Sequence, residues 1–378
     1  MESNIHIFII WEKAQEKTDE LLNDIKKKFI IREIYEVEWS KENFPRNLKR
    51  FYGDTLPNPL EKIKSCGTGK FLVVVIEDLK PNMGMRKTSI GKQLVNTNVY
   101  DRKMHYRRLI GGKYPIHASI NQKETNHDLT LIFGQNLEDV IKKLPTNWKG
   151  DKNILKKDLV GWNEWKDLKQ LFYVLNSTTN YLVLRNFENY PGIINEDHKD
   201  IDILTDDRWQ IKHILNMKLF KDKNGIKRLY VLIQNEKITF DIKYVGDSYY
   251  DEKWSKKMLD TKKFESGFYR PDEKNYFYSL LYHVLIHKKQ KSGEYFNELK
   301  QLGIKLQING ISHKTNYDNY LKILNLFMKE NKYRLTDSIC YKLKHNEFIR
   351  LKNVAIHVWK EEGLVYLLTA VKSKIKKW

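Results

Sequence analysis

Residues 181–207 read YLVLRNFENYPGIINEDHKDIDILTDD and hold the most informative pattern in the chain. The segment begins with an apolar run at 181–184, continues through a loop that contains Pro and Gly, and ends in a second apolar run, Asp200–Leu204. Side chains alternate along a strand, so Asp200 and Asp202 would share one face of it. Two neighbouring carboxylates on an apolar strand repel each other and lose hydration, a cost that a divalent cation between them would offset.

A third carboxylate, Asp241, interrupts the strand-like run ITFDIKY at 238–244. Three carboxylates on adjacent strands suit a two-metal site for phosphoryl or nucleotidyl transfer, because one ion activates the attacking oxygen and the other neutralises the leaving phosphate. The alternative is that D-x-D arises by chance in an acid-rich segment, to which Asp206 and Asp207 also belong. The placement of Asp241 on a strand of its own favours the metal site.

The order of these features resembles the polymerase-β-type nucleotidyltransferase superfamily. More narrowly, LRNFENYPGIINEDHKDIDIL at 184–204 looks like the "LRNYE…LP…DIDLL" stretch of a branch associated with surface-polysaccharide genes, and the resemblance covers about 181–250. It implies that Asp200 and Asp202 bind Mg²⁺ (or Mn²⁺), and that Asp241 completes one metal site and acts as the general base for an acceptor hydroxyl. It also implies a nucleotide or nucleotide-activated donor and a sugar, polyol or glycan acceptor.

The chain departs from the superfamily at one position. A Gly-Ser pair usually follows the first strand and seats the triphosphate, whereas Arg185 and Asn186 stand here. Arg185 could hold a phosphate group through a bidentate contact. The change strengthens the case for a nucleotide-activated sugar or polyol donor, or for a lost activity, relative to a nucleoside triphosphate donor.

The N-terminal part alternates between strand and helix patterns. We expect strands at 5–10, 29–37 and 71–76 and helices at 12–28 and 41–52. The continuous apolar run at 71–76 is typical of a strand buried on both faces. This alternation predicts an α/β domain with an at least partly parallel sheet.

The chain as a whole is therefore expected to be α/β with four parts. They are an α/β domain at 1–146, a linker at 147–158, a nucleotidyltransferase-like α/β domain with a mixed sheet at 159–255, and a helical region at 256–378. Apolar residues with helical spacing at 277–285 predict a buried helix face in the last part. His283 and His287, at i and i+4 on that helix, are interpreted as surface or hydrogen-bonded histidines and not as zinc ligands.

Composition bounds the class of protein. Of 378 residues, 41% are hydrophobic, which argues against a disordered chain, and 68 Lys+Arg against 48 Asp+Glu give a net charge of +20. No apolar run approaches the roughly 18–20 residues of a membrane span, and the N-terminus lacks signal-peptide features. Cys66 and Cys340 make no metal or redox spacing. We expect a cytoplasmic protein without a membrane span.

The positive charge has two interpretations. Arg86, Arg102, Arg107 and Arg108 lie among tyrosines in one basic stretch and could contact the phosphates of nucleic acid or another polyanion. Lys-rich composition also follows from codon drift in an AT-rich genome, in which case the charge is a solvated surface.

Two further motifs have both a functional and a structural interpretation. SCGTGK at 65–70 lacks the spacing of a phosphate-binding loop and is interpreted as a tight turn into a strand. His117, Glu124, His127 and Asp128 form a polar cluster that could bind a metal, although a structural role for His127 and Asp128 is favoured.

The sequence thus leaves three hypotheses. The first is a Mg²⁺-dependent transferase that moves a nucleotidyl or phosphoryl-linked group to a sugar, polyol or glycan. The second is a nucleotidyltransferase that acts on nucleic acid, and the third is a non-catalytic protein that binds polyanions.

Overall fold

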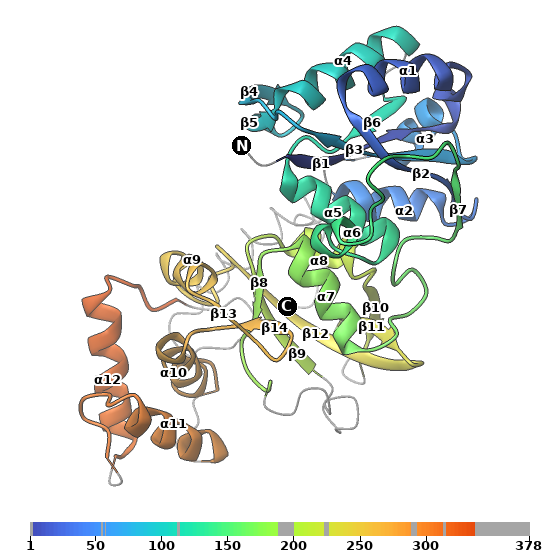
Figure 1. The fold of residues 1–378 in the computed structure, drawn as a ribbon. Helices are drawn as coiled ribbons and strands as arrows, with labels where there is room; N and C mark the ends of the chain where they lie inside the picture. Colours follow the sequence, from blue (N-terminus) through green and yellow to red (C-terminus); the bar gives the residue numbers. More distant parts are fainter. Residues whose placement is uncertain are drawn as a thin grey trace, which may run out of the picture. The chain divides into compact units, whose positions relative to one another are not determined.

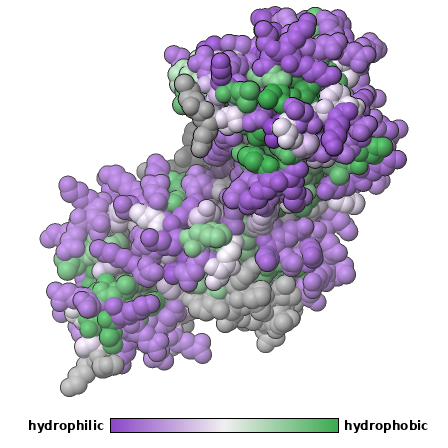
Figure 2. Space-filling view, viewed as in Figure 1, coloured by the Kyte–Doolittle hydropathy of each residue, from purple (hydrophilic) through white to green (hydrophobic). Residues whose placement is uncertain are grey.

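The computed structural model describes residues 3–53, 56, 58–111, 114–187, 200–222, 227–288, 293–312 and 315–336 (Figure 1). They form a mixed α/β structure that divides into two compact units. Unit 1 comprises Met1–Thr179 and Trp209–Lys237, and unit 2 comprises Asn180–Arg208 and Ile238–Trp378. Among the described helices, none is both long and apolar enough to cross a membrane. Hydrophilic residues cover most of the face seen in Figure 2.

Unit 1 contains a five-stranded sheet with the order β6-β1-β3-β2-β7. Its strands are β1 (Asn4–Ile10), β2 (Ile30–Glu38), β3 (Phe71–Asp78), β6 (Ile116–Ala118) and β7 (Asn153–Lys156). β3 runs antiparallel to both of its neighbours, β6 runs antiparallel to β1, and β7 runs parallel to β2. The sheet is therefore mixed.

Helices cover both faces of this sheet. Figure 1 shows α1 and α4 over one face and α2 and α5 over the other. The helices and remaining strands of unit 1 are the 3₁₀ helix η1 (Glu12–Lys17), α1 (Thr18–Lys28), α2 (Phe44–Tyr52), α3 (Pro59–Cys66), β4 (Met83–Thr88), β5 (Gly91–Asn96), α4 (Thr97–Ile110), α5 (Gln122–Phe133), α6 (Leu137–Ile141), α7 (Leu168–Thr178), α8 (Arg208–Ile214), β10 (Lys218–Lys221) and β11 (Lys227–Ile233). β4 and β5 form an antiparallel hairpin, as do β10 and β11.

Most N-terminal elements agree with the sequence-based expectation. The apolar run at 71–76 is a strand buried on both faces, as its composition predicts. The sheet is partly parallel, as expected, through the pair of β2 with β7, whereas β3 is antiparallel to both of its neighbours. β7 also lies inside the segment 147–158 that the sequence assigned to a linker.

Unit 2 contains a mixed group of three neighbouring strands. β8 (Tyr181–Val183) runs antiparallel to β9 (Asp200–Thr205), and β9 runs parallel to β12 (Glu236–Tyr244). The other elements are α9 (Glu252–Asp260), the hairpin β13 (Lys263–Glu265) and β14 (Phe268–Arg270), α10 (Glu273–Tyr282), the π-helix η4 (His283–Lys288), α11 (Glu294–Lys305) and α12 (Tyr317–Glu330). The end of the predicted helical region, 337–378, lies outside the described residues.

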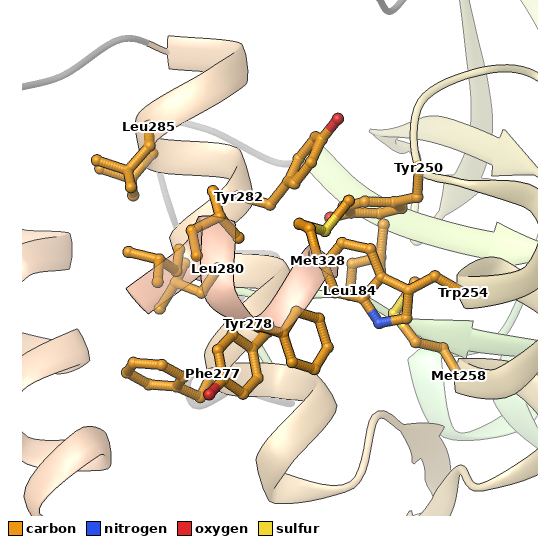
Figure 3. Close-up of a cluster of buried hydrophobic side chains, with 14 of the residues drawn as sticks. Leu184, Tyr250, Trp254, Met258, Phe277, Tyr278, Leu280, Tyr282, Leu285 and Met328 are labelled. Carbon is orange, nitrogen blue, oxygen red and sulfur yellow. The ribbon is translucent and has the colours of Figure 1, made fainter. Parts of the chain in front are cut away.

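An aromatic core fills unit 2. Tyr250, Trp254 and Tyr282 pack together with Met328 and Leu184 (Figure 3). The helix face predicted at 277–285 is buried in this core. Leu182 of β8 and Leu204 of β9 belong to this core, so it supports the strand that carries Asp200 and Asp202.

Candidate functional site

The acidic residues singled out in the sequence lie on β9 and β12. In the parallel register, Asp202 is the partner of Asp241, and Asp200 is the partner of Thr239. Register partners on adjacent parallel strands project to the same face of a sheet, and residues two apart on one strand do so as well. The structure therefore brings the side chains of Asp200, Asp202 and Asp241 to one face, as the sequence suggests.

Two of the three carboxylates already have cationic partners. Nε of Arg185 donates to Oδ2 of Asp202 at 2.8 Å, and Nζ of Lys243 donates to Oδ1 of Asp241 at 2.7 Å. Asp200 accepts a hydrogen bond from the hydroxyl of Thr239. Charge repulsion among the carboxylates is thus offset by residues of the chain itself, and the sequence argument that a metal is needed to stabilise them no longer holds.

Arg185 lies at the end of a buried polar chain. Its side chain is 3% exposed, and its Nη2 donates to the hydroxyl of Tyr249 at 3.0 Å. That hydroxyl lies 3.0 Å from Nδ1 of His283. Burial opposes the charge of the guanidinium, but the carboxylate of Asp202 and the neighbouring tyrosines raise the pKa of Arg185 above its ordinary value. Burial, followed by the charge of Arg185, lowers the pKa of His283, which is therefore neutral.

The histidines of the π-helix have structural partners. Nε2 of His287 lies 3.1 Å from the backbone oxygen of Tyr249, and His283 contacts the Tyr249 hydroxyl as described. This agrees with the interpretation of His283 and His287 as hydrogen-bonded residues. Neither is on the helix surface, since both are buried.

The backbone of Asn186 adopts a left-handed conformation. Its φ of 58° is in the left-handed region, which Asn tolerates better than most residues, and it is exposed. The sequence predicts that Arg185 and Asn186 contact phosphate, and this stays a prediction. The structure places the guanidinium of Arg185 on Asp202 and Tyr249, so Arg185 positions a carboxylate.

The donor set fits a hard divalent cation. Carboxylate oxygens are the ligands that Mg²⁺ and Mn²⁺ favour, and Asp241, 45% exposed, is open to an ion from solvent, whereas Asp202 is 14% exposed. Among the described residues, His117, Glu124 and Asp128 place three ligand atoms within 4.8 Å of one another, and the three aspartates of unit 2 do not. The three aspartates would have to move closer together to share one ion, and Lys243 competes with that ion for Oδ1 of Asp241.

Lys243 and Tyr249 are contacts that the sequence analysis did not single out. Lys243 lies two residues after Asp241, so the strand period alone could have placed both on one face. Its Nζ also lies 4.5 Å from the ring centroid of Tyr249. Nothing in the sequence marks Tyr249, because its role depends on the turn that returns it to Arg185.

A second candidate site is a cavity of about 670 Å³ in unit 1. Its lining contains five Lys and Arg residues. Lys87 and Lys123 are exposed, whereas Lys62 of α3 and Lys103 and Arg107 of α4 are buried or half-buried. The lining also includes Tyr52, Tyr100, Tyr114, His117, Glu124, His127 and Gln210.

Backbone oxygens anchor the three buried or half-buried cations of this cavity. Lys62 Nζ donates to Tyr114 O at 3.0 Å, Lys103 Nζ to Ala118 O at 2.9 Å, and Arg107 Nε to Ile116 O at 2.9 Å. Within the described part of the chain, none of the three forms an ion pair with a carboxylate.

Burial perturbs the protonation of these cations. It lowers the pKa of Lys62 from 10.5 to about 7 and also lowers the pKa values of Lys103 and Arg107. The charges of Arg107 and Lys103 also lower the pKa of Lys62, whereas the carboxylates of Glu124 and Asp128 raise the pKa of Lys103. Burial is the largest cause at all three cations, so an anion in the cavity would stabilise their charge.

The polar cluster at 117–128 forms the wall of the cavity. Nε2 of His117 lies 2.8 Å from Oδ2 of Asp128, and Nδ1 of His127 lies 3.0 Å from its Oδ1. Burial lowers the pKa of each histidine to about 4 and raises the pKa of Asp128 to about 6. Asp128 is therefore held by two neutral histidines, which agrees with the favoured structural role of His127 and Asp128.

The four arginines predicted to contact a polyanion do not form one set. Arg86 pairs with Asp101 at 2.9 Å and Arg102 with Asp24 at 3.2 Å. Arg107 lines the cavity, whereas Arg108 is exposed. Their role in binding a polyanion stays a prediction.

Comparison with known proteins adds no assignment: no protein-family model matches the chain, and no curated protein matches its sequence.

Proposed function

We propose that unit 2 is a metal-dependent transferase that moves a nucleotidyl or phosphoryl-linked group to a hydroxyl of a sugar, polyol or glycan. The observation that carries the proposal is the parallel register of β9 and β12, which aligns Asp202 with Asp241. The alternation of β9 adds Asp200 to the same face. This arrangement supports the nucleotidyltransferase resemblance at 181–250.

Each acidic residue has a role in this proposal. Asp200, Asp202 and Asp241 would hold Mg²⁺ or Mn²⁺, which neutralises charge on the transferred group and on the leaving group. Asp241, half-exposed and at the open side of the cluster, accepts the proton of the acceptor hydroxyl at its carboxylate. Arg185 fixes the orientation of Asp202 through its Nε and has its other contact on Tyr249.

One observation favours a second candidate. Because Arg185 and Lys243 neutralise two of the carboxylates, the strands are stable without a metal, and the fold could persist as a non-catalytic module that binds polyanions. The two candidates differ in one measurable property, since only the transferase needs Asp241 to bind a metal.

Calorimetric titration with Mn²⁺ tests the proposal. We expect the wild-type chain to bind Mn²⁺, and Asp241→Asn to bind it at least about tenfold more weakly, because one charged ligand is lost. Asp260→Asn, which removes an exposed carboxylate at the end of α9, is the matched control and should bind as the wild type does. Release of nucleoside phosphate or pyrophosphate from a panel of nucleoside triphosphates and nucleotide-activated sugars, lost in Asp241→Asn, would identify the donor.

Asp241 is a better position for this test than Asp202, because Asp241 is 45% exposed and solvent screens its ion pair. Lys243, 4% exposed, still loses this charged partner in Asp241→Asn, so thermal denaturation must show this variant to be folded. Replacing Asp202 would leave the guanidinium of Arg185 buried without a counter-charge, so loss of activity could reflect unfolding. Folded wild-type protein that binds no Mn²⁺ with any of these nucleotides would contradict the transferase and leave the non-catalytic module.

A further inference from the structure

We propose that the cavity of unit 1 binds an organic phosphate, with the phosphoryl group held by Lys62, Lys103 and Arg107. The proposal uses none of the residues of the transferase site, so either one can fail while the other stands.

The cations are built into the cavity wall. Lys62 is 4% exposed and Lys103 is 8% exposed, so both side chains are largely removed from water. Lys103 and Arg107 are four residues apart and therefore lie on one face of α4, which lines the cavity beside Lys62 from α3. Each uses one donor on a backbone oxygen, which fixes the nitrogen in place and leaves further N–H groups for a ligand.

The charge of the group favours a dianion. Several like charges in a buried space repel each other and lose hydration. Glu124 favours the charge of Lys103 and Arg107 from across the lining, but no carboxylate of the described residues lies within ion-pair distance of the three cations. A single carboxylate ligand would offset one charge only. A phosphoryl group carries nearly two negative charges near neutral pH and offers three acceptor oxygens, which matches three cationic donors.

The cavity has room for a molecule larger than inorganic phosphate. About 670 Å³ lies in the range of sites that enclose small organic molecules. Tyr52, Tyr100 and Tyr114 line it, and their rings give a ligand flat apolar contact area. Gln210 adds an amide that can donate and accept hydrogen bonds. A sugar or nucleoside attached to the phosphate would occupy this space.

A metal at His117, Glu124 and Asp128 is the competing occupant. Their ligand atoms lie within 4.8 Å of one another, but both oxygens of Asp128 are already engaged by His117 and His127. The nearby charges of Lys103 and Lys62 also lower the pKa of His117 and would repel a cation. The local charge therefore favours an anion.

Calorimetric titration of the full chain with inorganic phosphate, glucose 1-phosphate and adenosine diphosphate tests the proposal. We expect at least one of the two organic phosphates to bind more tightly than inorganic phosphate does. Lys103→Met and Lys62→Met should each weaken that binding about tenfold or more, as loss of a charge-assisted hydrogen bond implies. Lys27→Met removes an equal charge from an exposed position of α1 and should leave the affinity unchanged.

Thermal denaturation distinguishes lost binding from lost folding. The bound organic phosphate should raise the unfolding temperature of the wild type and of Lys27→Met, but not that of Lys103→Met, which should itself be folded. Absence of binding by all three probes at millimolar concentration would overturn the proposal, as would equal affinity in wild type and Lys103→Met. Tight Mn²⁺ or Zn²⁺ binding that is lost in Asp128→Asn would overturn it in favour of a metal site.

Discussion

Arg185 is the residue on which the acidic site of unit 2 depends for its stability. Its ion pair with Asp202 is buried, with side chains 3% and 14% exposed. In Arg185→Met the carboxylate would remain in a poorly hydrated place without its cation. We expect a loss of about 3–5 kcal/mol in the free energy of unfolding, measured by urea denaturation.

The paired variant is the control for this prediction. Arg185→Met combined with Asp202→Leu removes both charges of this buried pair and should recover most of the lost stability. If Arg185→Met alone had the same free energy of unfolding as the wild type, the ion pair would not stabilise the acidic site.

Lys62 gives a pH dependence whose direction follows from its burial. The pKa of its ammonium group is lowered to about 7 in the folded state from 10.5, so the unfolded chain binds more protons in the window between these values. Stability of unit 1 should therefore rise as pH rises from 7 to 9, by about 2 kcal/mol. Affinity for an organic phosphate should fall over the same range, because Lys62 loses its charge.

The measurement is the difference in free energy of unfolding between wild type and Lys62→Met at pH 7, 8 and 9. The groups around Lys62 are Cys66, Lys103 and Arg107, and burial raises the pKa of the Cys66 thiol to about 11. They are present in both proteins, so the difference isolates Lys62. A difference that stays constant with pH would show that Lys62 does not titrate in this range.

For single residues, the sequence predicts the acidic site residues better than the basic and aromatic residues that surround the sites. Asp200, Asp202 and Asp241 stand out because a carboxylate in an apolar strand is unusual. Lys62 does not, because a lysine in a Lys-rich helix is the common case and only its burial distinguishes it. Tyr249 reaches Arg185 through tertiary structure, for which a single sequence holds no pattern.

Strand β12 places an acid and its cation on the same face. Asp241 and Lys243 are two residues apart, and their ion pair at 2.7 Å competes with any metal for the carboxylate. In Lys243→Met that competition disappears, so Mn²⁺ should bind up to about fivefold more tightly, since an ion pair with a half-exposed partner is worth at most about 1 kcal/mol. Calorimetric titration against the wild type measures this change, and weaker binding in Lys243→Met would contradict the proposed metal position.

Helix α4 directs arginines that are close in sequence into different environments. The basic stretch reads as one surface, yet the helix turns Arg107 into the cavity, leaves Arg108 exposed and brings Arg102 to Asp24 of α1. Strand β3 is a similar case in a sheet. Its apolar run indicates burial on two faces but does not indicate the direction of the strand. In the structure, β3 runs antiparallel to both of its neighbours.

At the scale of the whole molecule, each compact unit is made of two separate stretches of the chain. The sequence places one domain at 159–255, whereas Asn180–Arg208 and Trp209–Lys237 belong to different units. Composition changes little along this chain, so no linker signal marks the points where it passes from one unit to the other. The α/β class itself follows from the periodicity of local runs and is confirmed.

The net charge of +20 is a property of the whole molecule. It is compatible with a diffuse basic surface and with a dedicated nucleic-acid site, and a comparison of variants distinguishes the two. Arg86 has a carboxylate partner, so we expect it and Arg108 to contribute no more to polyanion binding than surface lysines do. The double variants Arg86→Met/Arg108→Met and Lys27→Met/Lys28→Met remove equal charge from unit 1. Both should weaken binding to single-stranded nucleic acid equally, with equal changes in the slope of affinity against salt concentration, measured by fluorescence anisotropy. A much larger loss in the arginine variant would instead support the nucleic-acid hypothesis, because only a built site would distinguish two arginines from two exposed lysines.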